Sequence, residues 1–236
     1  MSVDPLIFLP GFMCDARLFW HQIIDFSADR AVIVAPLLGA SIEEMAEGVL
    51  VTAPARFGLV GHWLGGLVAM EILRRVPERV AGIALLDVSP LPETSTMAGE
   101  RELRILRART GRLDEVMLEE VPANALAPGP GREEVQAMAL EMAAALGPES
   151  FIRQSRALMR RPDQQRALRN TKVRAMLICG EYDTICPPRR HEFLAELMPH
   201  AEFRLIMGAG HLAPLEQPVK VSKAIRDWLD APLLLR

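Results

Sequence analysis

The sequence has little that would place it in a disulfide-stabilised, membrane-spanning or nucleic-acid-binding class. It contains three cysteines in 236 residues, without CxxC spacing, which favours reduced thiols in a cytoplasmic protein. No apolar run approaches the roughly 20 residues that span a bilayer, and the first residues lack the basic start of a secretory signal. The formal net charge of −3 gives no reason to expect a nucleic acid as partner.

Cofactor motifs are also missing. The chain has no HExxH zinc motif, no Walker loop and no dinucleotide-binding GxGxxG. The glycine-rich stretch at residues 61–66 lacks the spacing that cradles phosphate. We therefore expect no metal ion and no cofactor, and a small molecule as the ligand.

What the sequence does contain is a regular alternation of strands and helices. Strands are predicted at 6–9, 32–34, 57–60, 80–86, 175–179 and 203–207. Helices are predicted near 18–25, 64–75, 189–198 and 219–229, and from a capping box formed by Ser41 and Glu44 to about residue 53. This alternation predicts an α/β fold with a mostly parallel sheet of about six strands.

The alternation stops between residues 89 and 170, where only helical patterns occur. Helices are expected at 100–109, 113–120, 133–146 and 149–160, with a proline- and glycine-rich break at 122–131. Arginines and glutamates are interleaved along them, so we expect solvated outer faces. We predict a core of residues 1–88 and 171–236 and a helical lid of residues 89–170.

The turn between the third strand and its helix has the sequence Gly61-His62-Trp63-Leu64-Gly65-Gly66. Apart from Trp63, it matches the G-x-S-x-G nucleophile elbow. In such an elbow the central residue occupies a strained turn, and side chains at the flanking glycines would clash with the strand or the helix.

Two further motifs follow later strands in the order expected for this chemistry. GEYD at residues 180–183 places Asp183 after the fifth strand, and GAGH at 208–211 places His211 after the sixth. Nucleophile position, acid and histidine thus occur in the order found in α/β-hydrolases.

Together with LPGF at residues 9–12, these motifs resemble those of the compact bacterial α/β-hydrolases over nearly the whole chain. The resemblance implies a carboxylic ester hydrolase scaffold acting on a small or medium acyl substrate. It implies His211 as general base and Asp183 as the residue that orients it. It also implies the backbone N–H groups of Phe12 and Leu64 as donors to the oxyanion.

Trp63 departs from this family pattern. An indole has no nucleophilic oxygen or sulfur, and its N–H group is only a donor. Loss of one triad member removes a factor of about a million in rate in a serine protease. The indole should also fill the space of the acyl group, so we expect this chain to be impaired or inactive.

Three other residues are candidates for the missing or alternative roles. His62 should point away from the cleft, and Cys14 is expected to be a small buried residue. Asp87, at the end of its strand, is an alternative acid, although the Gly-x-x-Asp context favours Asp183.

The sequence leaves two other functions and two origins of Trp63 open. The chain could be a non-catalytic ligand-binding homologue, or it could use His211 and Asp183 as a general base without covalent catalysis. One base change turns a TCG serine codon into TGG, and the intact motifs favour a recent loss, natural or engineered, over a long-abandoned site. The exact substrate and the oligomeric state stay open.

Overall fold

The computed structural model describes residues 3–231, in which six strands form one sheet. The strand order is β2-β1-β3-β4-β5-β6, and every neighbouring pair is parallel. The strands are β1 (Leu6–Leu9), β2 (Val32–Val34), β3 (Phe57–His62), β4 (Val80–Leu86), β5 (Ala175–Gly180) and β6 (Glu202–Ile206). The predicted α/β class and all six predicted strands are confirmed.

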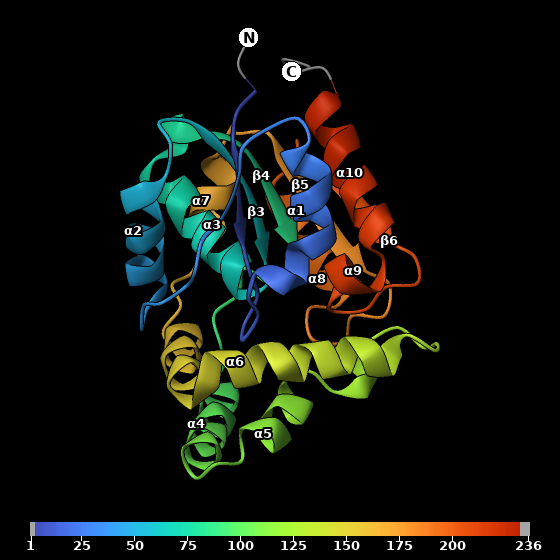
Figure 1. The fold of residues 1–236 in the computed structure, drawn as a ribbon. Coiled ribbons are helices and arrows are strands. Elements are labelled where there is room, and N and C mark those ends of the chain that lie inside the picture. The colour runs from blue at the N-terminus through green and yellow to red at the C-terminus, as the bar shows by residue number, and fades with distance from the viewer. Residues whose placement is uncertain (1–2, 232–236) are drawn as a thin grey trace.

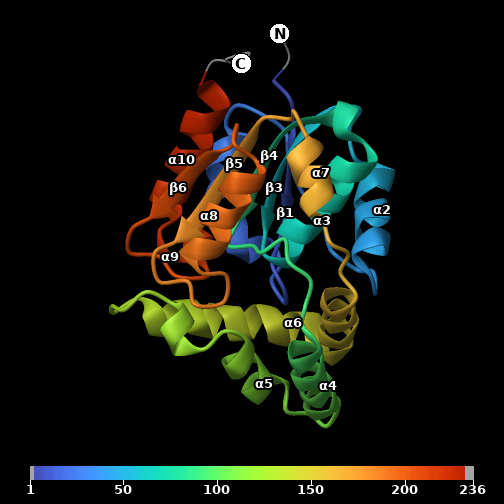
Figure 2. The ribbon, with the colours of Figure 1, turned by 180° about the vertical axis from the view of Figure 1, so that it is seen from behind.

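Helices cover both faces of the sheet. They are α1 (Trp20–Ser27), α2 (Ile42–Thr52), α3 (Leu64–Arg75), α8 (Pro188–Leu197), α9 (Ala213–Glu216) and α10 (Pro218–Asp230), with short 3₁₀ turns η1 (Ala16–Phe19) and η2 (Pro77–Arg79). Helices α1 and α10 pack together on one face, whereas α2, α3 and α8 lie on the other (Figures 1 and 2).

Burial on both faces explains the apolar runs of the central strands. Every residue of β1, β3 and β5 is buried, and so is α3 from Leu64 to Leu73. Strands covered on both sides lack the apolar–polar alternation of half-exposed strands. Edge strand β6 has exposed and partly exposed positions. Between residues 3 and 231, no helix combines the length and the apolar character that crossing a membrane requires.

The start of α2 differs in detail from the predicted capping box. The Ser41 hydroxyl accepts the Glu44 N–H at 3.1 Å, as expected. The Glu44 carboxylate, however, accepts the N–H of Ala40 at 2.8 Å rather than that of Ser41. The helix is therefore capped, but the hydrogen bond of the Glu44 side chain goes to the residue before the N-cap.

The segment between β4 and β5 contains the helices α4 (Ser95–Arg109), α5 (Leu113–Glu120), η3 (Ala123–Ala125), α6 (Arg132–Met159) and α7 (Gln165–Asn170). The two helices predicted at 133–146 and 149–160 meet in α6, at a break where Gly147 has φ 75° and ψ 172°. Helices α4, α5 and α6 lie beyond the carboxyl ends of the strands, whereas α7 packs against α3 and α8 (Figure 1). The division into core and lid stays a prediction.

The close approach of α3 to β1 yields a test of the fold. A Cβ atom at Gly65 would overlap the carbonyl group of Leu9, whereas a Cβ atom at Gly48, in α2, meets nothing within 4 Å. We expect Gly65→Ala to lower the free energy of unfolding by about 3 kcal/mol. Gly48→Ala, the matched control, should raise it by about 0.5–1 kcal/mol. Urea denaturation measures both, and equal stability of the two variants would contradict the close approach.

Candidate active site

Residue 63 forms the turn between β3 and α3. Trp63 has φ 42° and ψ −107°, values outside the regions that bulky residues ordinarily adopt. Its N–H donates to the Leu86 carbonyl at 2.9 Å, and its own carbonyl accepts the N–H of Leu67 at 3.1 Å. These bonds hold the strained turn in place, as expected for an elbow.

The glycines of this turn are required by its packing. A Cβ atom at Gly61 would come within 2.8 Å of the Cα atom of Gly66, and one at Gly65 would overlap the carbonyl of Leu9. Real Cβ atoms essentially never make such contacts. The motif therefore has a steric cause that does not depend on which residue occupies position 63.

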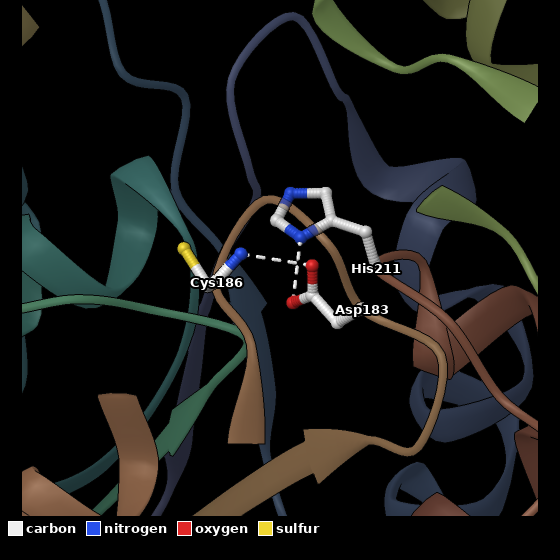
Figure 3. A group of neighbouring side chains, drawn as sticks. All are labelled: Asp183, Cys186 and His211. Carbon is white, nitrogen blue, oxygen red and sulfur yellow. Dashed lines mark hydrogen bonds and ion pairs between the residues drawn. The ribbon is translucent and has the colours of Figure 1, made fainter. Parts of the chain in front are cut away.

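The structure brings Asp183 and His211 together from two loops. The Nδ1 atom of His211 lies 2.9 Å from Oδ2 of Asp183, and both side chains are buried (Figure 3). Oδ1 of Asp183 accepts the backbone N–H groups of Ile185 and Cys186 at 2.8 and 2.9 Å. Burial opposes ionisation of this carboxyl, but the charge of His211 and these hydrogen bonds outweigh it and lower the pKa of Asp183.

The indole of Trp63 lies against the imidazole of His211. Their ring centroids are 4.7 Å apart and the rings are nearly perpendicular, at 83°. The Nε2 atom of His211 is buried and has no hydrogen-bond partner within residues 3–231. In a serine hydrolase this nitrogen takes the proton of the nucleophile. Here it is free for such a role, and the side chain beside it is an indole.

Phe12 encloses Trp63 on another side. The two ring centroids lie 5.2 Å apart, and Phe12 in turn contacts Phe151 of α6 at 5.3 Å. Only 7% of Trp63 is exposed to solvent. The indole therefore occupies the space next to His211.

The two backbone groups predicted as oxyanion donors belong to residues that adjoin Trp63. Leu64 is the first residue of α3, and Phe12 follows β1 by three residues. Within the described residues, neither N–H group has a hydrogen-bond acceptor. The next amide, that of Met13, donates to Oε1 of Gln154 at 2.8 Å, which ties this loop to α6.

His62 contacts His211 more closely than the sequence suggested. Its Nε2 atom lies 2.7 Å from the His211 carbonyl oxygen, and the two ring centroids are 5.1 Å apart. Burial, and then the charge of His211, lower the pKa of His62 to about 3, so that the ring is neutral and donates to the carbonyl. His62 thus supports the backbone of His211. The GHxLG pattern alone did not reveal this contact.

Asp87 is not placed as the partner of His211. Its Oδ1 atom accepts the N–H of Gly180 at 2.9 Å, and its Oδ2 atom lies 3.7 Å from Nε2 of His62. Burial, and then the neighbouring charge of Asp183, raise the pKa of Asp87 well above its ordinary value. The geometry thus favours Asp183 over Asp87 as the carboxylate that orients the histidine.

Sequence reasoning missed a third buried histidine, His191 of α8. Its Nε2 atom accepts the N–H of Val88 at 3.2 Å, and its side chain is fully buried. Burial lowers the pKa of His191 to about 4. A lone histidine in a helical pattern carries no signal for such a position.

The cysteines are poorly placed as nucleophiles. The Cys14 thiol donates to the carbonyl of Phe12 at 3.4 Å, and burial, followed by the charge of Asp15, raises its pKa to about 12. Burial likewise raises the pKa of Cys179 and of Cys186. All three are protonated thiols at neutral pH.

Asp183, Cys186 and His211 are close enough to suggest a metal site, since one ligand atom of each lies within 4.8 Å of the others (Figure 3). A cation would need the Cys186 thiolate and the Asp183 oxygens. The thiol is held protonated, and both carboxylate oxygens already accept hydrogen bonds. The donor set therefore fits a carboxylate–histidine pair better than a metal centre.

A cavity of about 500 Å³ opens beside Trp63. Its walls come from α3, from the segment after β4, from α4 and from the loop after Asp183. A second cavity, of about 350 Å³, lies near Trp228 and the first residues of β1. Because ligands of parallel sheets bind at the carboxyl ends of the strands, the cavity beside Trp63 is the candidate ligand site.

Comparison with known proteins identifies the family. The profile described as "Alpha/beta hydrolase family" matches residues 6–224, so the chain belongs to this family, as an esterase-like member. A putative carbamate hydrolase RutD from Pseudomonas savastanoi pv. phaseolicola is 27% identical over 96% of this chain and 94% of its own length. A pimeloyl-[acyl-carrier protein] methyl ester esterase from Aromatoleum aromaticum is 27% identical over 81% of each chain.

A solved structure agrees with this membership. A thermophilic esterase from Thermogutta terrifontis superimposes with a TM-score of 0.87 at 25% sequence identity, over 97% of this chain and 90% of the esterase. The predicted fold and family are thereby confirmed, and the scaffold is that of a hydrolase.

The buried histidines yield a prediction on pH. Because the pKa of His191 is about 4 in the folded protein and about 6.5 in the unfolded chain, only the unfolded chain binds the proton between these values. Stability contributed by neutral His191 is therefore present above pH 6.5 and is lost as the pH falls toward 4. His191→Gln, which keeps an acceptor for Val88, should reduce the slope of unfolding free energy against pH by up to about 1.4 kcal/mol per pH unit.

Urea denaturation at several pH values between 4.5 and 6 measures this slope. His200→Gln, at an exposed histidine, is the control for the substitution itself. An unchanged slope in His191→Gln would show that His191 takes up its proton without unfolding.

Proposed function

We propose that this chain carries a carboxylic ester hydrolase site whose nucleophile position is occupied by Trp63, so that acyl transfer is impaired or absent. The observation that carries the proposal is the free, buried Nε2 atom of His211 against the indole of Trp63. The histidine is oriented by a carboxylate at 2.9 Å, yet the side chain in front of it has no group to deprotonate.

The proposed roles follow the geometry of the site. Asp183 holds the Nδ1–H tautomer of His211, which leaves Nε2 as the general base. The amides of Phe12 and Leu64 are free to donate to an oxyanion formed next to residue 63. Only the nucleophile is missing from this set.

The relatives support an acyl substrate. Their names specify a carbamate in one case and a methyl ester in another, and both substrates are attacked at an acyl carbon. We propose a small or medium acyl compound for this chain.

The helical segment 89–170 is proposed as a lid over the site. The backbone N–H of His211 donates to the carbonyl of Ala125 at 2.7 Å, and Gln154 accepts the N–H of Met13. Residues of this segment also line the cavity beside Trp63. The segment thus contacts both loops of the proposed catalytic site.

A second candidate function is ligand binding without catalysis. It is favoured by the cavity of about 500 Å³ that persists although the indole fills the space at His211. In this function Trp63 would be a wall on which a ligand packs.

Trp63→Ser is the decisive substitution. The serine hydroxyl would stand on the elbow with a base beside it, so we expect hydrolysis of short p-nitrophenyl esters at least about a thousandfold faster than by the unmodified chain. Trp63→Ala removes the same bulk without adding a nucleophile and should stay inactive. The activity of Trp63→Ser should be lost again when His211→Gln is added.

Steady-state kinetics over a panel of esters and lactones, with circular dichroism as a check of folding, decides the matter. A folded Trp63→Ser variant that is inert toward the whole panel would refute the hydrolase proposal. Equal activity of Trp63→Ser and Trp63→Ala would refute the role of residue 63 as nucleophile.

A further inference from the structure

The cavity beside Trp63 is lined by an unusual number of charged side chains. They are Glu93, Glu100, Arg101, Arg104, Glu119, Glu120, Arg161 and Arg190. The sequence led us to expect solvated charges along these helices. That expectation is wrong for Arg101 and Glu120, whose side chains are only 6% and 4% exposed. Some of these charged side chains therefore lie in the interior of the cavity and are not solvated.

The buried glutamates of this cavity are fully paired. Arg101 donates to both carboxylate oxygens of Glu93, at 2.8 to 3.3 Å, and to Glu120 at 3.1 Å. Arg161 donates to Glu93 at 3.3 Å and to the carbonyl of Leu91 at 2.8 Å. The negative charge inside the cavity is thus already neutralised by protein groups.

Glu100 and Glu119 lie at the outer rim, where their side chains are 58% and 47% exposed. Glu119 pairs there with Arg107 at 2.6 Å. Both carboxylates also pair with Arg104, at 3.9 and 3.7 Å, and so balance that arginine. Within residues 3–231 neither forms an ion pair with Arg161 or Arg190.

Arg190 is the arginine without a partner. Within residues 3–231 its side chain forms no ion pair and no hydrogen bond, although it is partly buried in the first turn of α8. Its charge acts on two neighbours. Burial and the charges of Arg101 and Arg190 lower the pKa of Arg161. The charges of Arg161 and Arg190 also act to lower the pKa of Cys186, although burial outweighs them and raises it. Arg161 and Arg190 thus both line the cavity, and Arg190 adds a positive charge that no carboxylate of the described residues pairs with.

The cavity is close to the proposed catalytic residues. The backbone N–H of Cys186 donates to Asp183 at 2.9 Å, and Cys186 and Trp63 both line the cavity. An anion held by the two arginines would extend from the acyl position into the cavity. Guanidinium groups match the planar, two-oxygen geometry of a carboxylate.

We propose that Arg161 and Arg190 form a carboxylate-binding subsite, so that the ligand of this cavity is an acyl compound carrying a second, ionised carboxyl group. The acyl part of this description rests on the proposed function. The carboxylate part rests only on the two arginines. A half-ester of a dicarboxylic acid has the required chemistry.

Calorimetric titration of the unmodified chain tests the subsite without any need for catalysis. The probes are the monoethyl esters of succinic, glutaric and adipic acid, with the corresponding diethyl esters as neutral controls. We expect at least one monoester to bind about tenfold more tightly than its diethyl ester.

Matched variants locate the effect. Arg190→Gln should abolish most of this preference, because it removes an unpaired charge and no internal contact. Arg189→Gln changes the exposed neighbour on the same helix, which does not line the cavity, and should alter affinity by less than about twofold. If no monoester is preferred, or if both variants lose the preference equally, the subsite is refuted.

The experiments distinguish a failure of the carboxylate subsite from a failure of the proposed hydrolase function. A Trp63→Ser variant that hydrolyses esters with no dependence on charge, in a chain that binds no monoester preferentially, would overturn the subsite alone. An inert Trp63→Ser variant in a chain whose carboxylate binding depends on Arg190 would overturn the hydrolase proposal and support the subsite.

Discussion

The close packing of α3 against β1 is the constraint on which the rest of the site depends. Because Gly65 has no side chain, the first turn of α3 lies directly against the carbonyl group of Leu9 at the end of β1. This contact places the turn at Trp63 and the loop of Phe12 at the same edge of the sheet. The rings of Phe12 and His211 then both lie against the indole of Trp63, which stands on the strained turn just before Leu64.

Behind these rings lies a buried network that is independent of residue 63. Burial lowers the pKa of His62 and of His191, which keeps both rings neutral, and it raises the pKa of Asp87. Asp183 is the exception, because four interactions, led by the charge of His211, lower its pKa. The network thus concentrates its negative charge where it orients His211. The hydrogen bonds of Asp183 to His211, Ile185 and Cys186 do not involve the side chain of Trp63.

The strands and the elbow could be predicted because their causes are local. Apolar runs bounded by glycines and prolines predicted the six strands, and the glycine spacing predicted a turn that only residues without a side chain can pack. Some contacts between distant segments that no family motif marks were not predicted. The contact of His62 with the carbonyl of His211 joins residues 149 positions apart, and the burial of Arg101 depends on Glu93 and Glu120 arriving from other elements.

The sequence by itself determined the class of fold, the family and the residue that departs from the family's elbow motif, since each follows from residue types at fixed local spacing. Only the tertiary structure decided that the indole of Trp63 packs edge to face with His211, between it and Phe12. It also decided which charges of the helical segment face inward and that Arg190 has no ion-pair partner among residues 3–231. These outcomes depend on how distant segments meet. The burial of a side chain and the pairing of its charge are set by contacts between segments, so they cannot be read from one segment alone.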